Sequence, residues 1–174
     1  QFAYPYAEWF FGDQADKFRF AHLQEALTFV PFGVAVDEFQ HICYAHPELT
    51  AKERTYQWHL LEEKYMPWRR YEDNAFMERG GYWYHKLHIY LYPFYYINYT
   101  LTTMGAMEFK KKYAENKEAA WQDYLRLCKV GGSRNYLETL RDANLANPFE
   151  PGSVERACGY AEKILLEQIA EQEQ

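Results

Sequence analysis

Residues 88–99 combine one imidazole with a dense set of phenols. Steps of four and three residues carry Tyr92, Tyr96 and Tyr99 onto one face of a helix, with His88 one turn earlier if the helix begins there. These groups donate hydrogen bonds at neutral pH, so they could hold a peptide carbonyl or stabilise the oxyanion of a tetrahedral intermediate. An aromatic stripe with helical spacing is also typical of a buried core. Four tyrosines within eight residues would then each need a buried partner, which favours an open face.

Two other groups of residues have spacings that metal sites use. Glu38 and His41 form a Glu-x-x-His pair, which is half of a di-metal carboxylate site, but the sequence has no second such pair. His85 and His88 are three residues apart and Glu78 lies upstream, but no further ligands are defined. The sequence contains no H-E-x-x-H, no G-x-S-x-G and no glycine-rich phosphate loop. We therefore expect no metal site in this chain.

The overall composition argues against several classes of function. The 174 residues carry a net charge of -6 with mixed acidic and basic side chains, so neither nucleic acid nor anionic lipid is an expected partner. The longest uncharged stretch, residues 87–107, is too polar to span a membrane. Three widely spaced cysteines form no disulfide framework, which favours a reducing, cytoplasmic location. Aromatic residues make up 20% of the chain, as expected of a large core or an aromatic groove.

The apolar periodicity predicts an all-α chain. Helices are expected over residues 13–30, 33–45, 50–65, 93–112, 117–130, 134–143 and from 153 onward. Pro31 is expected to end the first helix, and Thr50 with Glu53 forms a capping box that begins the third. Gly80 and Gly81 are expected to form a hinge or a tight turn before the tyrosine-rich stretch.

Both the turn near residue 131 and the beginning of the chain carry further signals. Gly131-Gly132-Ser133 predicts a helix stop followed directly by an N-cap at Ser133. The chain starts with Gln1 and an apolar run that has no features of a signal peptide. The beginning therefore reads as the continuation of an element that started earlier.

Together these motifs resemble the oligoendopeptidase F branch of the thimet oligopeptidase family of zinc peptidases. The resemblance runs along nearly the whole chain, and its most specific parts are the tyrosine-rich block and the Gly-Gly-Ser turn. It is carried by Phe11-Gly12-Asp13-Gln14-Ala15-Asp16-Lys17, Val36-Asp37-Glu38-Phe39-Gln40-His41, Leu87-His88-Ile89-Tyr90, Pro93-Phe94-Tyr95-Tyr96-Ile97-Asn98-Tyr99 and Gly131-Gly132-Ser133.

The resemblance implies that residues 1–174 are the C-terminal, substrate-binding part of a helical peptidase catalytic domain with a deep channel. It implies a zinc ion held by an H-E-x-x-H helix and a later Glu, all of which would precede Gln1. The missing N-terminal part of the enzyme and short peptides would be the partners, and the chain alone would be inactive. The implied roles are oxyanion stabilisation by Tyr99 and Tyr92 and substrate binding by His88, Tyr95 and Tyr96. Separately, the position of Gly80 and Gly81 just before this block predicts a hinge that lets the loop close over peptide. Whether Tyr95 or Tyr96 would face the zinc stays open.

Two alternatives from other functional classes remain at this point. The chain could be an autonomous helical module whose tyrosine-lined groove binds peptide without cleaving it. It could also be a metal-carboxylate bundle centred on Glu38 and His41, which iron or manganese binding to the isolated chain would reveal.

Overall fold

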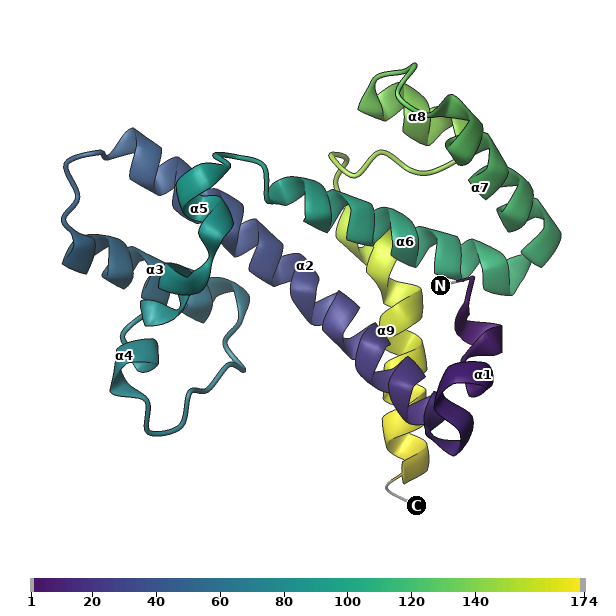
Figure 1. The fold of residues 1–174 in the computed structure, drawn as a ribbon, viewed down its shortest axis with the longest axis horizontal. Coiled ribbons are helices and arrows are strands. Elements are labelled where there is room, and N and C mark those ends of the chain that lie inside the picture. The colour runs from purple at the N-terminus through teal and green to yellow at the C-terminus, as the bar shows by residue number, and fades with distance from the viewer. Residues whose placement is uncertain (1, 173–174) are drawn as a thin grey trace. The chain divides into compact units, whose positions relative to one another are not determined.

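The computed structural model describes residues 2–172, and no strand occurs in that range. This confirms the predicted all-α class. The chain divides into two compact units, one of residues 28–100 and the other of the residues up to Leu27 together with those from Leu101 onward. The α-helices are α1 (Glu8–Phe11), α2 (Ala15–Ala45), α3 (Ala51–Tyr65), α4 (Ala75–Glu78), α5 (Leu87–Leu91), α6 (Ile97–Glu115), α7 (Lys117–Val130), α8 (Tyr136–Asp142) and α9 (Ser153–Gln172) (Figure 1). Short 3-10 helices are η1 (Tyr4–Tyr6), η2 (Gly12–Gln14) and η3 (Gly81–His85).

Helix α2 continues through Pro31, so the prediction of two separate helices, 13–30 and 33–45, is wrong. A proline inside a helix removes one backbone hydrogen bond and crowds the preceding turn. Here the residues that follow it, Phe32, Ala35 and Val36, are all buried in the core of unit 28–100. Burial of this face offsets the lost hydrogen bond, so the helix continues past Pro31 although a proline usually ends a helix.

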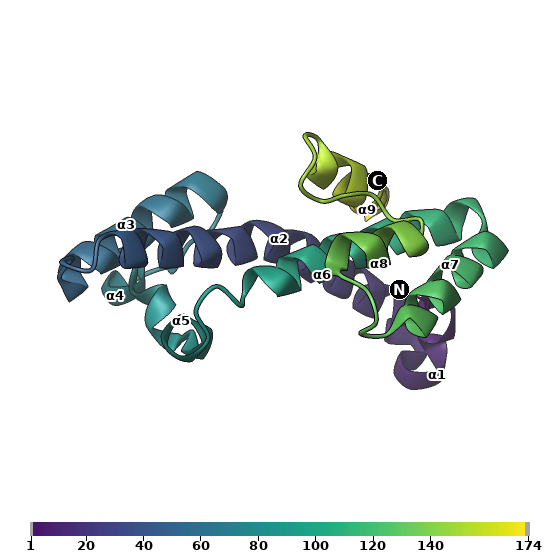
Figure 2. The same cartoon turned by 90° about the horizontal axis from the view of Figure 1, so that it is seen from above.

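Helix α3 begins with the predicted capping box. The Thr50 hydroxyl accepts from the Glu53 backbone nitrogen, and the Glu53 carboxylate accepts in return from the Thr50 nitrogen at 2.8 Å. Helices α2 and α3 then lie side by side in both views of the ribbon (Figure 1 and Figure 2).

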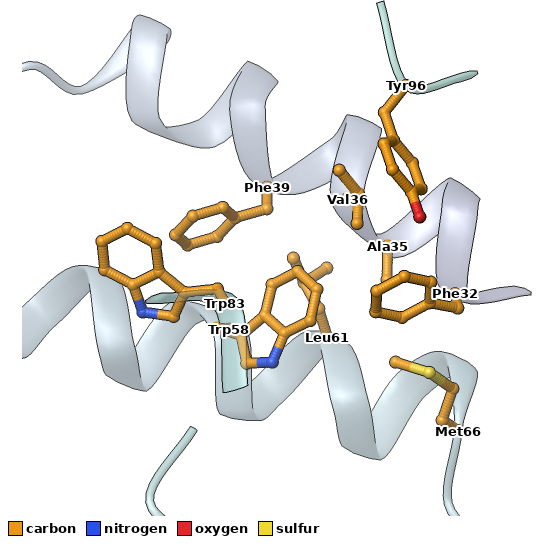
Figure 3. Packing of buried hydrophobic residues seen from close by; sticks show 9 residues of the cluster. All are labelled: Phe32, Ala35, Val36, Phe39, Trp58, Leu61, Met66, Trp83 and Tyr96. Atoms are coloured by element: carbon orange, nitrogen blue, oxygen red, sulfur yellow. The ribbon is translucent and has the colours of Figure 1, made fainter. Parts of the chain in front are cut away.

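The core of unit 28–100 is mainly aromatic. Its buried members are Phe32, Ala35, Val36, Phe39, Trp58, Leu61, Met66, Trp83 and Tyr96 (Figure 3). The Trp58 ring is fully buried and meets Phe39 edge to face, with ring centroids 5.4 Å apart. Trp83 of η3 and Tyr96 from the turn before α6 complete the cluster, so the core ties the tyrosine-rich block to α2 and α3.

The tyrosine-rich block is not one helix. Helix α5 ends at Leu91 and α6 begins only at Ile97, so the predicted helix over 93–112 starts four residues late and its one-face arrangement is wrong. Tyr92 leaves the helical region (φ −133°, ψ 73°) because the ring of the following proline disfavours that region for the residue before it. Phe94 then turns the chain with φ of 58°, a left-handed value that is rare for a bulky residue.

In the other unit, helix α7 spans the predicted residues 117–130, so that prediction is confirmed. The predicted N-cap of the next helix, Ser133, is wrong. Ser133 donates its hydroxyl to the Val130 carbonyl at 2.6 Å, and Asn135 caps α8 in a box with Glu138. Asn and Ser cap helices about equally well, so residue type alone could not choose between them. The core of this unit contains Phe109, Leu140, Ala143 and Leu145.

None of the helices within residues 2–172 combines the length and the apolar character that crossing a bilayer requires.

Candidate functional site

His88 lies on α5, and its ring is close to the rings of four tyrosines. The centroid distances are 5.7 Å to Tyr92, 6.3 Å to Tyr95, 5.1 Å to Tyr96 and 5.5 Å to Tyr99. The His88 Nε2 atom and the Tyr99 hydroxyl share a hydrogen bond of 3.3 Å. The structure therefore brings all five predicted residues together, and we call them the His-Tyr cluster. They come together because of the turn between α5 and α6, and they do not share one helix face.

The members of the His-Tyr cluster differ in their exposure to solvent. Tyr92 is 52% exposed, Tyr95 is 48% exposed and Tyr99 is 37% exposed, whereas Tyr96 is only 6% exposed. The sequence allowed either a core stripe or an open face, and the block divides between the two. Tyr96 belongs to the core, and the other three tyrosines present an open group of phenols around His88.

Two hydroxyls of the cluster have shifted pKa values. Burial raises the pKa of Tyr96 to about 12. Burial and a hydrogen bond with Tyr95 raise the pKa of Tyr99 above its ordinary value. A raised phenol pKa means that the hydroxyl keeps its proton throughout the neutral range. Tyr96 and Tyr99 are therefore hydrogen-bond donors at neutral pH, which is the protonation state that binding a carbonyl or an oxyanion requires.

The turn that forms the cluster is held by residues to which the sequence reasoning gave no such role. The Phe94 ring lies 4.7 Å from the His41 ring and 5.0 Å from the Tyr44 ring, so α2 supports the left-handed turn. The Glu-x-x-His spacing drew attention to His41 as a metal ligand, and its observed contact is with an aromatic ring. No periodicity signal could have shown this, because the partners are about 50 residues apart in the sequence.

Lys86, directly before α5, contacts the His-Tyr cluster through the ring of Tyr96. Its ammonium lies 4.9 Å from the Phe32 ring centroid and 5.3 Å from that of Tyr96, which is cation–π geometry. Burial lowers the pKa of Lys86, and the positive charge of Arg69 lowers it further. The only signal in the sequence was the position of Lys86 next to the motif, since the contact depends on how the core packs.

Gly80 and Gly81 connect α4 to η3 in a crowded place. Gly80 has φ of 95°, which is left-handed, and a β-carbon there would lie 2.8 Å from the His59 nitrogen and closer still to the Thr55 carbonyl oxygen. Gly81 is buried against Phe76. Both positions thus need glycine for close backbone approach to neighbouring helices.

Comparison with known proteins identifies the family. The model of peptidase family M3 matches residues 11–159. The chain belongs to peptidase family M3. A crystal structure of a protein assigned as oligoendopeptidase F is 49% identical, with a TM-score of 0.89 over 94% of this chain and 29% of that one. A comparison with curated protein sequences gave no match.

Two further solved structures show the same relation. PZ peptidase A with an inhibitor is 47% identical, with a TM-score of 0.90 over 95% of this chain and 30% of that chain. A protein assigned as oligoendopeptidase F from Bacillus anthracis str. Ames is 39% identical, with a TM-score of 0.76 over 95% of this chain and 26% of that chain. This M3 chain therefore spans less than a third of each structure that it matches.

The candidate metal residues of this M3 chain have other contacts. Glu38 accepts from the Lys64 ammonium at 2.8 Å and from the Tyr65 hydroxyl, and these two partners lower the pKa of its carboxyl. His41 Nε2 lies 3.3 Å from Asp37, and His85 donates to a backbone carbonyl. Among residues 2–172, no three His, Cys, Asp or Glu side chains are grouped so that they could hold a metal ion.

Proposed function

We propose that this chain is the substrate-binding and transition-state-stabilising part of a zinc oligopeptidase that hydrolyses internal bonds of short peptides. One observation carries the proposal: a chain of peptidase family M3 holds a histidine among four tyrosines, three of which are open to solvent. Peptide hydrolysis passes through a tetrahedral intermediate with a negatively charged oxygen, and positioned hydroxyl donors stabilise that charge.

Each member of the His-Tyr cluster has a role in this proposal. Tyr99 and Tyr92 donate hydrogen bonds to the oxyanion as it forms. His88 and Tyr95 bind the peptide backbone, since both are accessible and can donate to a carbonyl. Tyr96 is buried, and its ring meets the His88 ring in a T-shaped contact with an interplanar angle of 74°, so its contribution to substrate binding is to hold that imidazole in place.

Zinc is part of the proposal, but residues 2–172 do not fit it. The described residues offer no group of three ligands, so we propose that the ion is bound by parts of the complete protein outside this chain. When bound, zinc supplies Lewis-acid chemistry, which polarises the substrate carbonyl and activates a water molecule. The three cysteines are free thiols, in keeping with the reducing cytoplasm proposed for the protein.

Activity and zinc content test the proposed function together. The complete protein should cleave short fluorogenic peptides at internal bonds, and a chelator should abolish cleavage. The 174-residue chain alone should show neither cleavage nor stoichiometric zinc. An autonomous peptide-binding module would instead bind the same peptides without cleaving them, even in the complete protein. Cleavage that persists after full removal of metal would contradict the proposal.

The η3 segment after Gly80 and Gly81 is proposed to close over bound peptide, with these glycines as the hinge. Trp83 of this segment is buried in the core and its Nε1 donates to the Thr55 hydroxyl at 3.4 Å, so the proposed movement lies in the residues on either side of Trp83. An active-site inhibitor should therefore slow amide hydrogen exchange in residues 80–86 of the complete protein. Exchange that is indifferent to the inhibitor would rule out closure.

A further inference from the structure

A cavity of about 320 Å³ lies beside the His-Tyr cluster in the same unit. Ile89 and Tyr90 form part of its wall directly after His88, and Tyr44 joins its wall to the Phe94 ring. Its lining residues come from α2, α3, η3, α5 and the loop after α2: Phe39, Gln40, Cys43, Tyr44, Pro47, Arg54, Trp83, Ile89 and Tyr90. The walls are mostly aromatic and aliphatic, with one amide and one guanidinium, which is a composition typical of ligand sites.

Gln40 is an unusual component of this wall. Its side chain is 1% exposed, and neither the amide nitrogen nor the amide oxygen has a hydrogen-bond partner among the described residues. An unpaired buried amide costs about 1–3 kcal/mol relative to one that is paired. Both amide atoms are sealed from solvent, so a peptide in the cavity reaches them once the Gln40 side chain rotates towards it; the side chain then offers one acceptor and two donors, which can pair with both the N–H and the C=O of a peptide unit.

Arg54 supplies the charge. Its Nε donates to the Leu49 carbonyl and its Nη2 to the Pro47 carbonyl, both at 3.1 Å, so the guanidinium is fixed at the rim of the cavity. Within residues 2–172 it forms no ion pair, since the carboxylates nearest in the sequence bind elsewhere, Glu48 to His46 and Glu53 to Thr50. The positive charge of Arg54 also acts on Cys43, another residue of the cavity wall: burial raises the pKa of the Cys43 thiol, and Arg54 opposes that shift.

We propose that this cavity binds the C-terminal residue of a peptide, with Arg54 on the free α-carboxylate, the Gln40 amide on the last peptide unit and the aromatic walls around a bulky apolar side chain. The volume suits one or two residues, because pockets for drug-sized ligands begin near about 300 Å³. The inference rests on the proposed function, since it takes a peptide as the ligand. It adds a rule of selection: peptides with a free carboxyl end and a large apolar last residue are preferred.

Paired peptides test the proposal in the complete peptidase. Two substrates share one sequence ending in Phe, and one carries a free carboxylate while the other carries a C-terminal amide. The free acid should be cleaved with a kcat/KM about 10-fold to 100-fold higher, as expected for a hydrogen bond to a charged group. In Arg54→Gln this ratio should fall to about one, and Arg54→Lys should keep part of it because the charge remains.

Gln40→Leu separates binding from folding. Because the Gln40 amide has no partner within the described residues, Leu should leave the Tm unchanged or raise it, yet raise KM for both peptides about 10-fold. Tyr99→Phe should lower the cleavage rate of both peptides equally and leave the ratio of their kcat/KM values unchanged.

A wild-type kcat/KM ratio near one, or a ratio that Arg54→Gln leaves intact, overturns this site while cleavage still supports the proposed function. If no peptide is cleaved, the proposed function fails, and the affinities of fluorescently labelled forms of the two peptides for wild type and Arg54→Gln still decide the carboxylate site.

Discussion

Replacing Tyr99 by Phe in the complete peptidase is expected to lower kcat about 100-fold and to change KM by less than about threefold. Removal of one oxyanion donor typically costs about 3 kcal/mol of transition-state stabilisation, and the ground-state carbonyl uses that donor little. Tyr99 is 37% exposed, so loss of its hydroxyl leaves no sealed cavity that would destabilise the fold. Steady-state kinetics on a fluorogenic peptide measure both constants.

The control for this experiment is Tyr56→Phe. Tyr56 is 57% exposed on α3 and belongs to neither the His-Tyr cluster nor the cavity beside it, so its kinetics should match the wild type. Tyr92→Phe should behave like Tyr99→Phe, since both are proposed to face the oxyanion. If kcat is unchanged in both Tyr92→Phe and Tyr99→Phe, the proposed role of the cluster is lost.

Gly80→Ala should lower the free energy of unfolding by about 3 kcal/mol, the sum of a left-handed backbone and a backbone clash. With φ of 95°, an alanine is strained at this position, and its β-carbon would press on the backbone of α3 at Thr55 and His59. Backbone atoms cannot move aside as a flexible side chain can. Thermal unfolding of the complete protein, followed by circular dichroism, would show the loss as a lower Tm.

Two other glycines supply matched controls for the Gly80 experiment. Gly131 also has positive φ, 52°, with ψ of −133°, but nothing lies within 4 Å of its added β-carbon, so Gly131→Ala should show the backbone strain alone, about 1–3 kcal/mol. Gly132 has open space around it and no positive φ, so Gly132→Ala should be close to neutral. If Gly80→Ala is as stable as Gly132→Ala, the close packing of η3 on α3 is wrong.

Where local chemistry decides the structure, the sequence was a reliable guide. The capping box at Thr50 and Glu53 and the periodicity of residues 117–130 each specify a helix through contacts within one turn, and both were predicted correctly. Pro31 failed as a stop signal because the apolar face beyond it packs against α3, a partner that no local pattern reveals. Fold class was therefore predictable, and the continuity of α2 was not.

The His-Tyr cluster was predictable in membership but not in geometry. Helical counting grouped Tyr92, Tyr96 and Tyr99, and these residues do meet around one imidazole. They meet because Pro93 and Phe94 break the helix and fold the chain back, which puts Tyr96 in the core and leaves Tyr92 and Tyr99 open. Exposure of a given phenol depends on this turn, and spacing carries no information about it.

The left-handed turn at Phe94 has a practical consequence for protein engineering. A designer who copied residues 88–99 onto a stable helix of another scaffold would reproduce the sequence but would spread the phenols along one helix face instead of gathering them around the His88 ring. A faithful transplant would also need His41 and Tyr44, on which the Phe94 ring rests, and Lys86 with the aromatic rings beneath its ammonium. The smallest segment that can be grafted is thus a folded module of several helices. A short synthetic peptide with the same sequence would not reproduce the His-Tyr cluster.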